Sequence, residues 1–512
     1  MGRVGQGRVA EELELAITGK PENVKAGIAL AIMYIDRGEA KKALRVTQAM
    51  HEHAPENLTL LNLLGTAQVA AKQNDLARRS FEKAISLDPN FITAYLNLSK
   101  LDTAERKPAE ARQRLQKLHE RFPESSAILI ELARTDQANG DYEQAGFWLE
   151  QARKIDSRSM ATILALVDLK LKTGRFSEAV NVALEGKKID RDNIQLLDAL
   201  GRSYIAAGNR GKARGVFQKM SDLAGFNAKQ LYRIAEQQTA VADYAEAIKT
   251  LKKAVVGNEF YIPAQIALAE MELKHGKPIF ALNRAQYLVK QYPRQAFGYR
   301  LLGDIDSQEG HFAQAVKNYQ LAFDREQNPK LVMKLYAALK QAGEGAKAFA
   351  LLERWVKANP QDNAPLEALA EEHLQAGRLP EAQNYYEILV GRDKNQPYLL
   401  NNLAYIYFNS GDERALKYAE QARQLAPEQP SINDTLGWIL VNNGQPEQGL
   451  HYLRSAYARS SQDPEIHYHI AVALYRLGRL EEAKQELQQA LSAKRPFNGI
   501  DEARSLLKQI SE

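Results

Sequence analysis

The chain has 512 residues, of which 45% are hydrophobic, 26% charged and 8% aromatic, and this composition excludes disordered low-complexity and collagen-like proteins. Its 68 lysines and arginines against 63 aspartates and glutamates give a net charge of +5 with the two signs interleaved, so no nucleic-acid partner is indicated. The cysteine count of 0 excludes thiol catalysis, disulfides and thiolate zinc sites, and it fits a cytosolic and a periplasmic location equally well.

An internal repeat of 34 residues organises the chain from about Pro21 to Leu491. A small residue recurs nine times at a constant step of 34, and two of the later steps are 33; it lies at Ala43, Ala77, Ala111, Ala145, Ala179, Ala213, Ala247, Ala281, Ala315, Ala348, Ala382, Ala415, Gly449 and Ala483. Five residues earlier, or four in one unit, lies a turn position that is usually glycine; it comprises Gly38, Lys72, Arg106, Gly140, Gly174, Gly208, Ala242, Gly276, Gly310, Gly343, Gly377, Gly411, Gly444 and Gly478.

Each unit is predicted to be a helix hairpin, because two apolar patterns of helical spacing, about 12 to 14 residues long, flank each turn. Glycine at the turn supplies a positive φ that ends the first helix, and the small residue five positions later lets the second helix approach the first closely. Proline then ends many of the second helices, at Pro55, Pro89, Pro123, Pro293, Pro360 and Pro427. One hairpin cannot bury its apolar face alone, so neighbouring hairpins are expected to stack.

The period, the turn glycine, the alanine, an aromatic residue or leucine four positions later and the closing proline together resemble the tetratricopeptide repeat. Residues 60–89 and 466–491 match that pattern almost throughout. The resemblance implies an all-α fold, a right-handed α-solenoid of about 14 helix hairpins, with a C-terminal capping helix at Asp501 to Ile510.

Four regions follow in chain order. Residues 1–20 are expected to form a partial repeat or an N-terminal capping helix, since Val9, Leu13, Ala16 and Pro21 fall on the register of a second repeat helix. This region is also the expected point of a truncation, in which case a signal sequence would lie upstream. Residues 21–395 form the N-terminal and central repeats, residues 396–495 the C-terminal repeats, and residues 496–512 the capping helix. The longest nearly apolar run, residues 26–35, is about half the length that crosses a bilayer, so no transmembrane segment is expected.

The first helices of such hairpins line the concave side of the stack, which allows groove residues to be chosen from the repeat register. The central units are expected to present a secondary charged groove made of Arg134, Arg202, Glu236, Glu270, Arg300, Asp304 and Glu371. A row of carboxylates could attract a basic partner segment. The preferred interpretation is that these charges are solvated and paired locally, because arginines lie on the same surface.

The last three first helices carry the most informative groove, because they combine aromatic rings with amides. Its candidate residues are Asn401, Tyr405, Phe408, Asn409, Asp434, Trp438, Asn442, Tyr468, Tyr475 and Arg476. Exposed rings offer flat apolar area at a low cost in conformational entropy, and amides bond to peptide backbones or sugar hydroxyls. The alternative is that several of these side chains only pack between helices.

Neither a metal nor a cofactor is expected. His51 with His53, and His467 with His469, are two residues apart and point to different sides of a helix. The chain contains neither a phosphate-binding loop nor a nucleophile elbow, so the sequence does not predict an enzyme.

The motifs at 401–404, 434–438 and 465–469 (NNLA, DTLGW and EIHYH) resemble the end of the bacterial PEP-CTERM-system tetratricopeptide lipoproteins of the PrsT type. That resemblance implies a periplasmic scaffold that serves exopolysaccharide synthesis or export and surface-protein sorting, with a protein or peptide partner in the concave groove. No lipobox cysteine is present, so membrane attachment would depend on a missing lipidated N-terminus. Two alternatives stay open: a cytoplasmic peptide-binding adaptor or co-chaperone, and the recruiting arm of an enzyme whose catalytic domain is missing.

Overall fold

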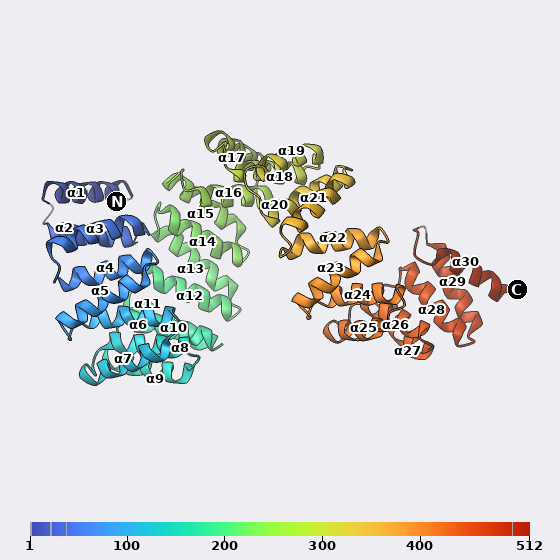
Figure 1. The fold of residues 1–512 in the computed structure, drawn as a ribbon, viewed down its shortest axis with the longest axis horizontal. Helices are drawn as coiled ribbons and strands as arrows, with labels where there is room; N and C mark the ends of the chain where they lie inside the picture. Colours follow the sequence, from blue (N-terminus) through green and yellow to red (C-terminus); the bar gives the residue numbers. More distant parts are fainter. Residues whose placement is uncertain (1–2, 21–22, 37, 494) are drawn as a thin grey trace. The chain divides into compact units, whose positions relative to one another are not determined.

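The computed structural model describes residues 3–20, 23–36, 38–493 and 495–512, and within these ranges it contains thirty helices and no strand. The chain divides into two compact units, Met1–Ala281 and Leu282–Glu512, which are drawn in Figure 1. The prediction of an all-α chain is confirmed.

The first unit contains α1 (Arg3–Gly19), α2 (Val24–Asp36), α3 (Ala40–His53), α4 (Leu58–Ala70), α5 (Asn74–Leu87), α6 (Ile92–Ala104), α7 (Pro108–Arg121), α8 (Ser126–Ala138), α9 (Tyr142–Ile155), α10 (Met160–Lys172), α11 (Phe176–Ile189), α12 (Ile194–Ala206), α13 (Arg210–Leu223), α14 (Ala228–Ala240), α15 (Tyr244–Gly257) and α16 (Ile262–His275). The helix α17 (Pro278–Gln291) spans the boundary between the units.

The second unit contains α18 (Ala296–Gln308), α19 (Phe312–Phe323), α20 (Pro329–Gln341), α21 (Gly345–Ala358), α22 (Asn363–Gln375), α23 (Leu379–Arg392), α24 (Pro397–Asn409), α25 (Arg414–Leu425), α26 (Pro430–Asn442), α27 (Pro446–Tyr457), α28 (Pro464–Arg476), α29 (Leu480–Ser492) and α30 (Ile500–Ser511). The helices α2 to α29 therefore follow one another as fourteen pairs, with α1 before them and α30 after them. This arrangement confirms the predicted number of hairpins and the C-terminal helix.

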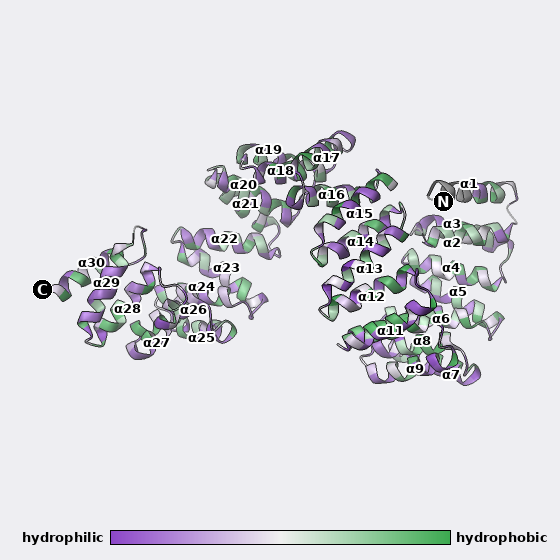
Figure 2. Ribbon diagram, turned by 180° about the vertical axis from the view of Figure 1, so that it is seen from behind, coloured by the Kyte–Doolittle hydropathy of each residue, from purple (hydrophilic) through white to green (hydrophobic). Residues whose placement is uncertain are grey.

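Stacking of neighbouring pairs forms the core of each unit. Apart from α17, which spans the boundary between the units, the two helices of a pair contact one another and each second helix contacts the next first helix. Successive first helices such as α4 and α6, or α24 and α26, also touch. Hydrophilic and hydrophobic residues are interleaved along the helices of both units (Figure 2). Each pair leaves one apolar face for its neighbours, as a repeat array requires.

The turns explain the glycine period. Thirteen of the fourteen turn positions have positive φ, and Gly276, at −122°, is the exception. Three of the thirteen are not glycine: Lys72 has φ 59°, Arg106 has 63° and Ala242 has 57°. These three residues thus adopt the same left-handed turn as the glycines, although residues with a Cβ atom do not favour it.

The recurring small residues lie where the paired helices cross. The repeated alanines are at most 5% exposed, with Ala315 at 0%. In the α4–α5 pair the first helix contributes Gly65, and a Cβ atom placed there would lie 2.4 Å from the Phe81 ring. The aromatic residue four positions after the alanine therefore fills the space that the small residue of the first helix leaves free.

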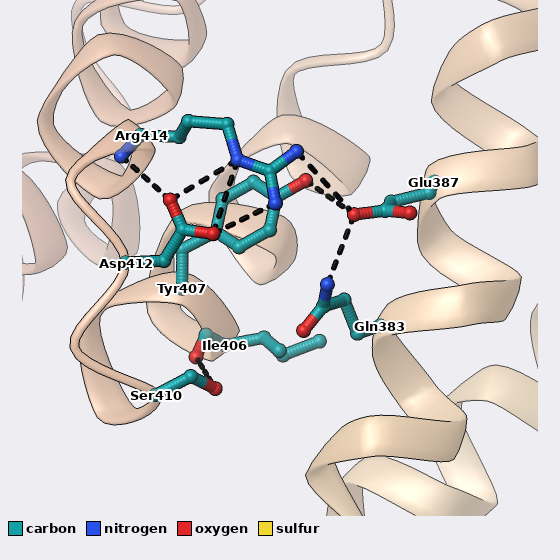
Figure 3. A network of polar contacts seen from close by, with 7 residues as sticks. All are labelled: Gln383, Glu387, Ile406, Tyr407, Ser410, Asp412 and Arg414. Atoms are coloured by element: carbon teal, nitrogen blue, oxygen red, sulfur yellow. Dashed lines mark hydrogen bonds and ion pairs between the residues drawn. The ribbon is translucent and has the colours of Figure 1, made fainter.

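Between α24 and α25 the step from the turn glycine, Gly411, to the small residue, Ala415, is four instead of five, and a polar network lies at this turn (Figure 3). Between α24 and α25, Asp412 Oδ1 accepts from the backbone N–H of Arg414 at 2.9 Å, and its carboxylate also binds the Arg414 guanidinium at 2.7–3.1 Å. The guanidinium lies 4.1 Å from the centroid of the buried Tyr407 ring. The Tyr407 hydroxyl donates to Glu387 of α23 at 2.6 Å, which ties this hairpin to the preceding one.

The N-terminal helix packs as a partial repeat or a cap would. Leu13 and Ile17 of α1 lie against the cluster that contains Leu30 and Tyr34 of α2. Pro21, which was expected to close this element, lies outside the described residues.

The predicted region boundaries fall between helices. The boundary after residue 395 lies between α23 and α24, inside the second compact unit, and the boundary after residue 495 lies between α29 and α30.

Candidate functional site

A pocket of about 680 Å³ lies among the last three first helices, α24, α26 and α28, and the segment that leads into α30. It belongs entirely to the second unit. Its lining comprises Tyr405, Phe408, Asn409, Pro430, Ser431, Asp434, Thr435, Trp438, Ser460, Asp463, Glu465, Ile466, Tyr468, His469, Asn498, Gly499 and Glu502. The repeat register accounts for the place of its aromatic residues, because Tyr405 and Trp438 occupy equivalent positions in consecutive units.

Six of the ten groove residues expected from the sequence line this pocket: Tyr405, Phe408, Asn409, Asp434, Trp438 and Tyr468. Tyr468 is only 8% exposed, so it forms part of the floor and not of the rim.

The other four expected residues lie outside the pocket, which corrects the prediction for them. Asn401 is buried, at 9% exposure, and has no hydrogen bond at Oδ1 among the described residues. Asn442 donates to the Trp438 carbonyl at 2.9 Å, and Arg476 donates to Asn442 at 2.8 Å. The Tyr475 hydroxyl accepts from Gln509 of α30 at 2.9 Å. Arg476 therefore links α28 to α26, and Tyr475 links α28 to α30.

The centre of the pocket is a stack of rings. Trp438 and His469 stack with centroids 4.1 Å apart and planes 16° from parallel. The centroid of the Tyr468 ring lies 5.7 Å from that of Trp438 and 6.1 Å from that of Phe497. Asp434 Oδ1 lies 2.9 Å from His469 Nδ1 and so fixes the orientation of that ring. The Trp438 indole therefore packs face to face against a ring that is itself bound to Asp434.

Four carboxylates, Asp434, Asp463, Glu465 and Glu502, surround these rings. Arg495 lies 3.0 Å from Asp463 Oδ1, and Asn498 donates to Glu465 Oε1 at 3.2 Å. Burial raises the pKa of the Glu465 carboxyl above its ordinary value, and the nearby charges of Asp434 and Asp463 act in the same direction, against His469 and Asn498. Burial, together with the charge of Glu465, also raises the pKa of the Tyr405 hydroxyl.

The segment before α30 completes the pocket through a glycine. Gly499 has φ 87°, and a Cβ atom there would lie 2.4 Å from the Tyr468 ring. Only glycine allows the backbone to adopt that conformation and approach the ring so closely.

Sequence reasoning missed the pocket-lining role of His469, Glu465, Asn498 and Glu502. The first two lie in the EIHYH motif, which was a signal of their importance, whereas Asn498 and Glu502 follow the last repeat and have no register.

The residues of the predicted secondary charged groove belong to both units, and each has a charged or hydrogen-bonding neighbour or another partner. Three arginines form ion pairs with a carboxylate on the same helix, with nitrogen–oxygen distances of 3.3 Å for Arg134–Glu131, 2.9 Å for Arg202–Asp198 and 2.8 Å for Arg300–Asp304. The Tyr386 hydroxyl donates to the Glu371 carboxylate at 3.0 Å. Glu236 accepts from Tyr232, and Glu270 also has a partner. These contacts agree with the interpretation of solvated, locally paired charges.

Neither a metal site nor a membrane span is found in the part of the chain that the structure describes. No group of three or more histidine, aspartate or glutamate residues there is arranged to hold a metal ion. No helix among the described residues is long and apolar enough to cross a membrane.

Comparison with protein-family models identifies a helix-pair repeat, in agreement with the series of helix pairs in the structure. Models of the tetratricopeptide repeat match residues 102–157 and 440–510, residues 367–430, and residues 58–91. The TPR repeat-containing protein YpiA of Bacillus subtilis is 23% identical over 73% of this chain and 81% of its own length.

Other relatives match over smaller shares of their length. Lipopolysaccharide assembly protein B of Escherichia coli is 24% identical over 42% of this chain and 58% of its own, and the TPR repeat-containing protein PA4667 of Pseudomonas aeruginosa is 24% identical over 49% and 36%. A chain in the crystal structure of the APC/C hetero-tetramer Cut9–Hcn1 aligns with a TM-score of 0.38 and 15% identity, over 89% of this chain and 96% of that chain.

Proteins of this repeat class are generally non-catalytic scaffolds that bind other proteins. The 34-residue period, the fourteen helix pairs and the matching family models identify this chain as a tetratricopeptide-repeat protein.

Proposed function

We propose that the chain is a non-catalytic interaction scaffold of the bacterial periplasm that serves exopolysaccharide biosynthesis or export, and that a protein partner docks in the C-terminal pocket. The observation that carries the docking site is the preformed ring stack of Trp438 and His469 inside a pocket of about 680 Å³. A held aromatic ring adds contact area without losing rotamer freedom on binding, which favours a binding hot spot.

The envelope role is supported by two similarities. The chain matches part of lipopolysaccharide assembly protein B, whose name places that protein in lipopolysaccharide assembly. The NNLA, DTLGW and EIHYH motifs resemble those of PEP-CTERM-system lipoproteins, and they lie on α24, α26 and α28, the helices that build the pocket.

The test uses the full-length protein in its native host. The double variant Tyr405→Ala/Trp438→Ala is expected to reduce surface polysaccharide while the protein remains at normal abundance, because it removes the aromatic surface of the pocket. The matched control, Tyr142→Ala/Phe147→Ala, removes two aromatic side chains that are 42% and 50% exposed on α9 and is expected to leave polysaccharide unchanged. Equal polysaccharide levels in both variants, or recovery of the protein in the cytoplasmic fraction, would contradict the proposal.

A further inference from the structure

The charge of the C-terminal pocket specifies its ligand more closely than its shape does. Among the described residues that line it, four are carboxylates, one is a histidine, and none is lysine or arginine. The chain as a whole carries a net charge of +5, so the acidity is local to this pocket and does not follow from the composition.

The partners that the fold supplies offset only part of this charge. Arg495 pairs with Asp463, and Asp434 contacts the His469 ring. Glu502 is exposed at the start of α30 and forms no ion pair or hydrogen bond among the described residues. Glu465 has only the neutral amide of Asn498 as its hydrogen-bond donor. A cation that entered the pocket would meet two carboxylates, those of Glu465 and Glu502, that form no ion pair among the described residues.

The rings favour the same kind of ligand. Tyr405 and Trp438 line the pocket beside these carboxylates. A lysine ammonium or an arginine guanidinium is attracted to the face of such a ring, and a guanidinium also forms paired hydrogen bonds with a carboxylate. An acidic peptide would be repelled, and a neutral glycan would leave the carboxylate charges uncompensated.

We infer that the pocket binds a basic segment of the protein partner, with a lysine or arginine side chain seated against Tyr405 and Trp438 between Asp434, Glu465 and Glu502. This inference rests on the proposed function, because it names the chemistry of the partner that docks in the same pocket.

The test is isothermal titration of the full chain with hexa-arginine and hexa-lysine as probes, beside hexa-glutamate and maltohexaose. The basic peptides are expected to bind, and more weakly as salt rises, because screening reduces the attraction. Glu502→Gln, which alters an exposed side chain and should leave the fold intact, is expected to weaken binding several-fold. The double variant Asp434→Asn/Glu502→Gln is expected to weaken it about tenfold or more, with its fold checked by circular dichroism.

A matched control separates the pocket from the overall charge. Glu420→Gln/Glu447→Gln changes the net charge by the same amount at exposed positions on α25 and α27, and it should leave binding of the basic peptides unchanged. Absence of binding, equal losses in the pocket and control variants, or pocket-dependent binding of hexa-glutamate or maltohexaose would overturn the inference. If Tyr405→Ala/Trp438→Ala still reduces surface polysaccharide in that case, the scaffold function stands and only the ligand class is wrong.

Discussion

Replacing the three turn residues that are not glycine with glycine should increase the stability of the chain, and the turn geometry allows the size of the increase to be estimated. Lys72, Arg106 and Ala242 have φ between 57° and 63°, a region that costs an L-residue about 1–2 kcal/mol. Glycine removes that cost and adds up to about 1 kcal/mol of backbone entropy in the unfolded chain. Each substitution to glycine is therefore expected to stabilise its hairpin by about 1 kcal/mol, within a range of about 0–2 kcal/mol, and the triple variant by about 3 kcal/mol, because distant sites add.

Urea denaturation followed by circular dichroism measures this change as an increase in the denaturation midpoint. The matched control is Gly174→Ala, at a turn with φ 73° and with no atom within 4 Å of the added Cβ, which should destabilise by a similar amount. A triple variant that is less stable than the parent chain would refute the reasoning, since it would mean that the side chains at 72, 106 and 242 contribute more than their backbone conformation costs.

Three further predictions concern single side chains. Ala315→Glu buries a charge where α18 and α19 cross, so it should destabilise the second unit by several kcal/mol and expose it to limited proteolysis; resistance equal to that of the parent chain would contradict this. Tyr407→Phe removes the hydrogen bond to Glu387 and should cost about 1 kcal/mol in urea denaturation, whereas Tyr398→Phe, whose hydroxyl bonds Glu367 on the exposed surface, should cost less. Folding raises the pKa of the Glu465 carboxyl, so the folded chain binds that proton more tightly, and the stability of the fold decreases as pH rises from the ordinary glutamate pKa through the raised one. Glu465→Gln should therefore raise the melting temperature at pH values above this window and leave it unchanged below the window. An equal shift at all pH values would exclude titration of Glu465 as the cause.

The sequence predicted the repeat architecture because one local signal recurs in every unit. A glycine followed by an alanine five positions later marks both the end of a first helix and the crossing point with the second, and the positive φ of Gly174 and the burial of Ala315 confirm both roles. Lys72 and Ala242 adopt the same turn without glycine, so the turn conformation is kept where the residue type does not favour it.

The site was predicted only in part, because repeat register gives the face of a helix and not what covers it. Tyr405 and Trp438 could be assigned to the pocket from their equivalent positions. Tyr475 and Arg476 occupy the repeat positions of Phe408 and Asn409, which line the pocket, but Arg476 bonds to the preceding hairpin and Tyr475 to α30. Glu502 belongs to the segment after the last repeat, where no periodic pattern indicates which residues return to the pocket.

Photocrosslinking in the native host tests the central claim most directly. A benzophenone amino acid in place of Thr435, which lines the pocket, would capture the segment that occupies it, and mass spectrometry would identify that segment. We expect one protein partner, joined through a stretch rich in lysine or arginine, and loss of the adduct in the Asp434→Asn/Glu502→Gln background. An adduct with an acidic segment, or the same adducts from a benzophenone placed at Glu420 on α25, would contradict the account.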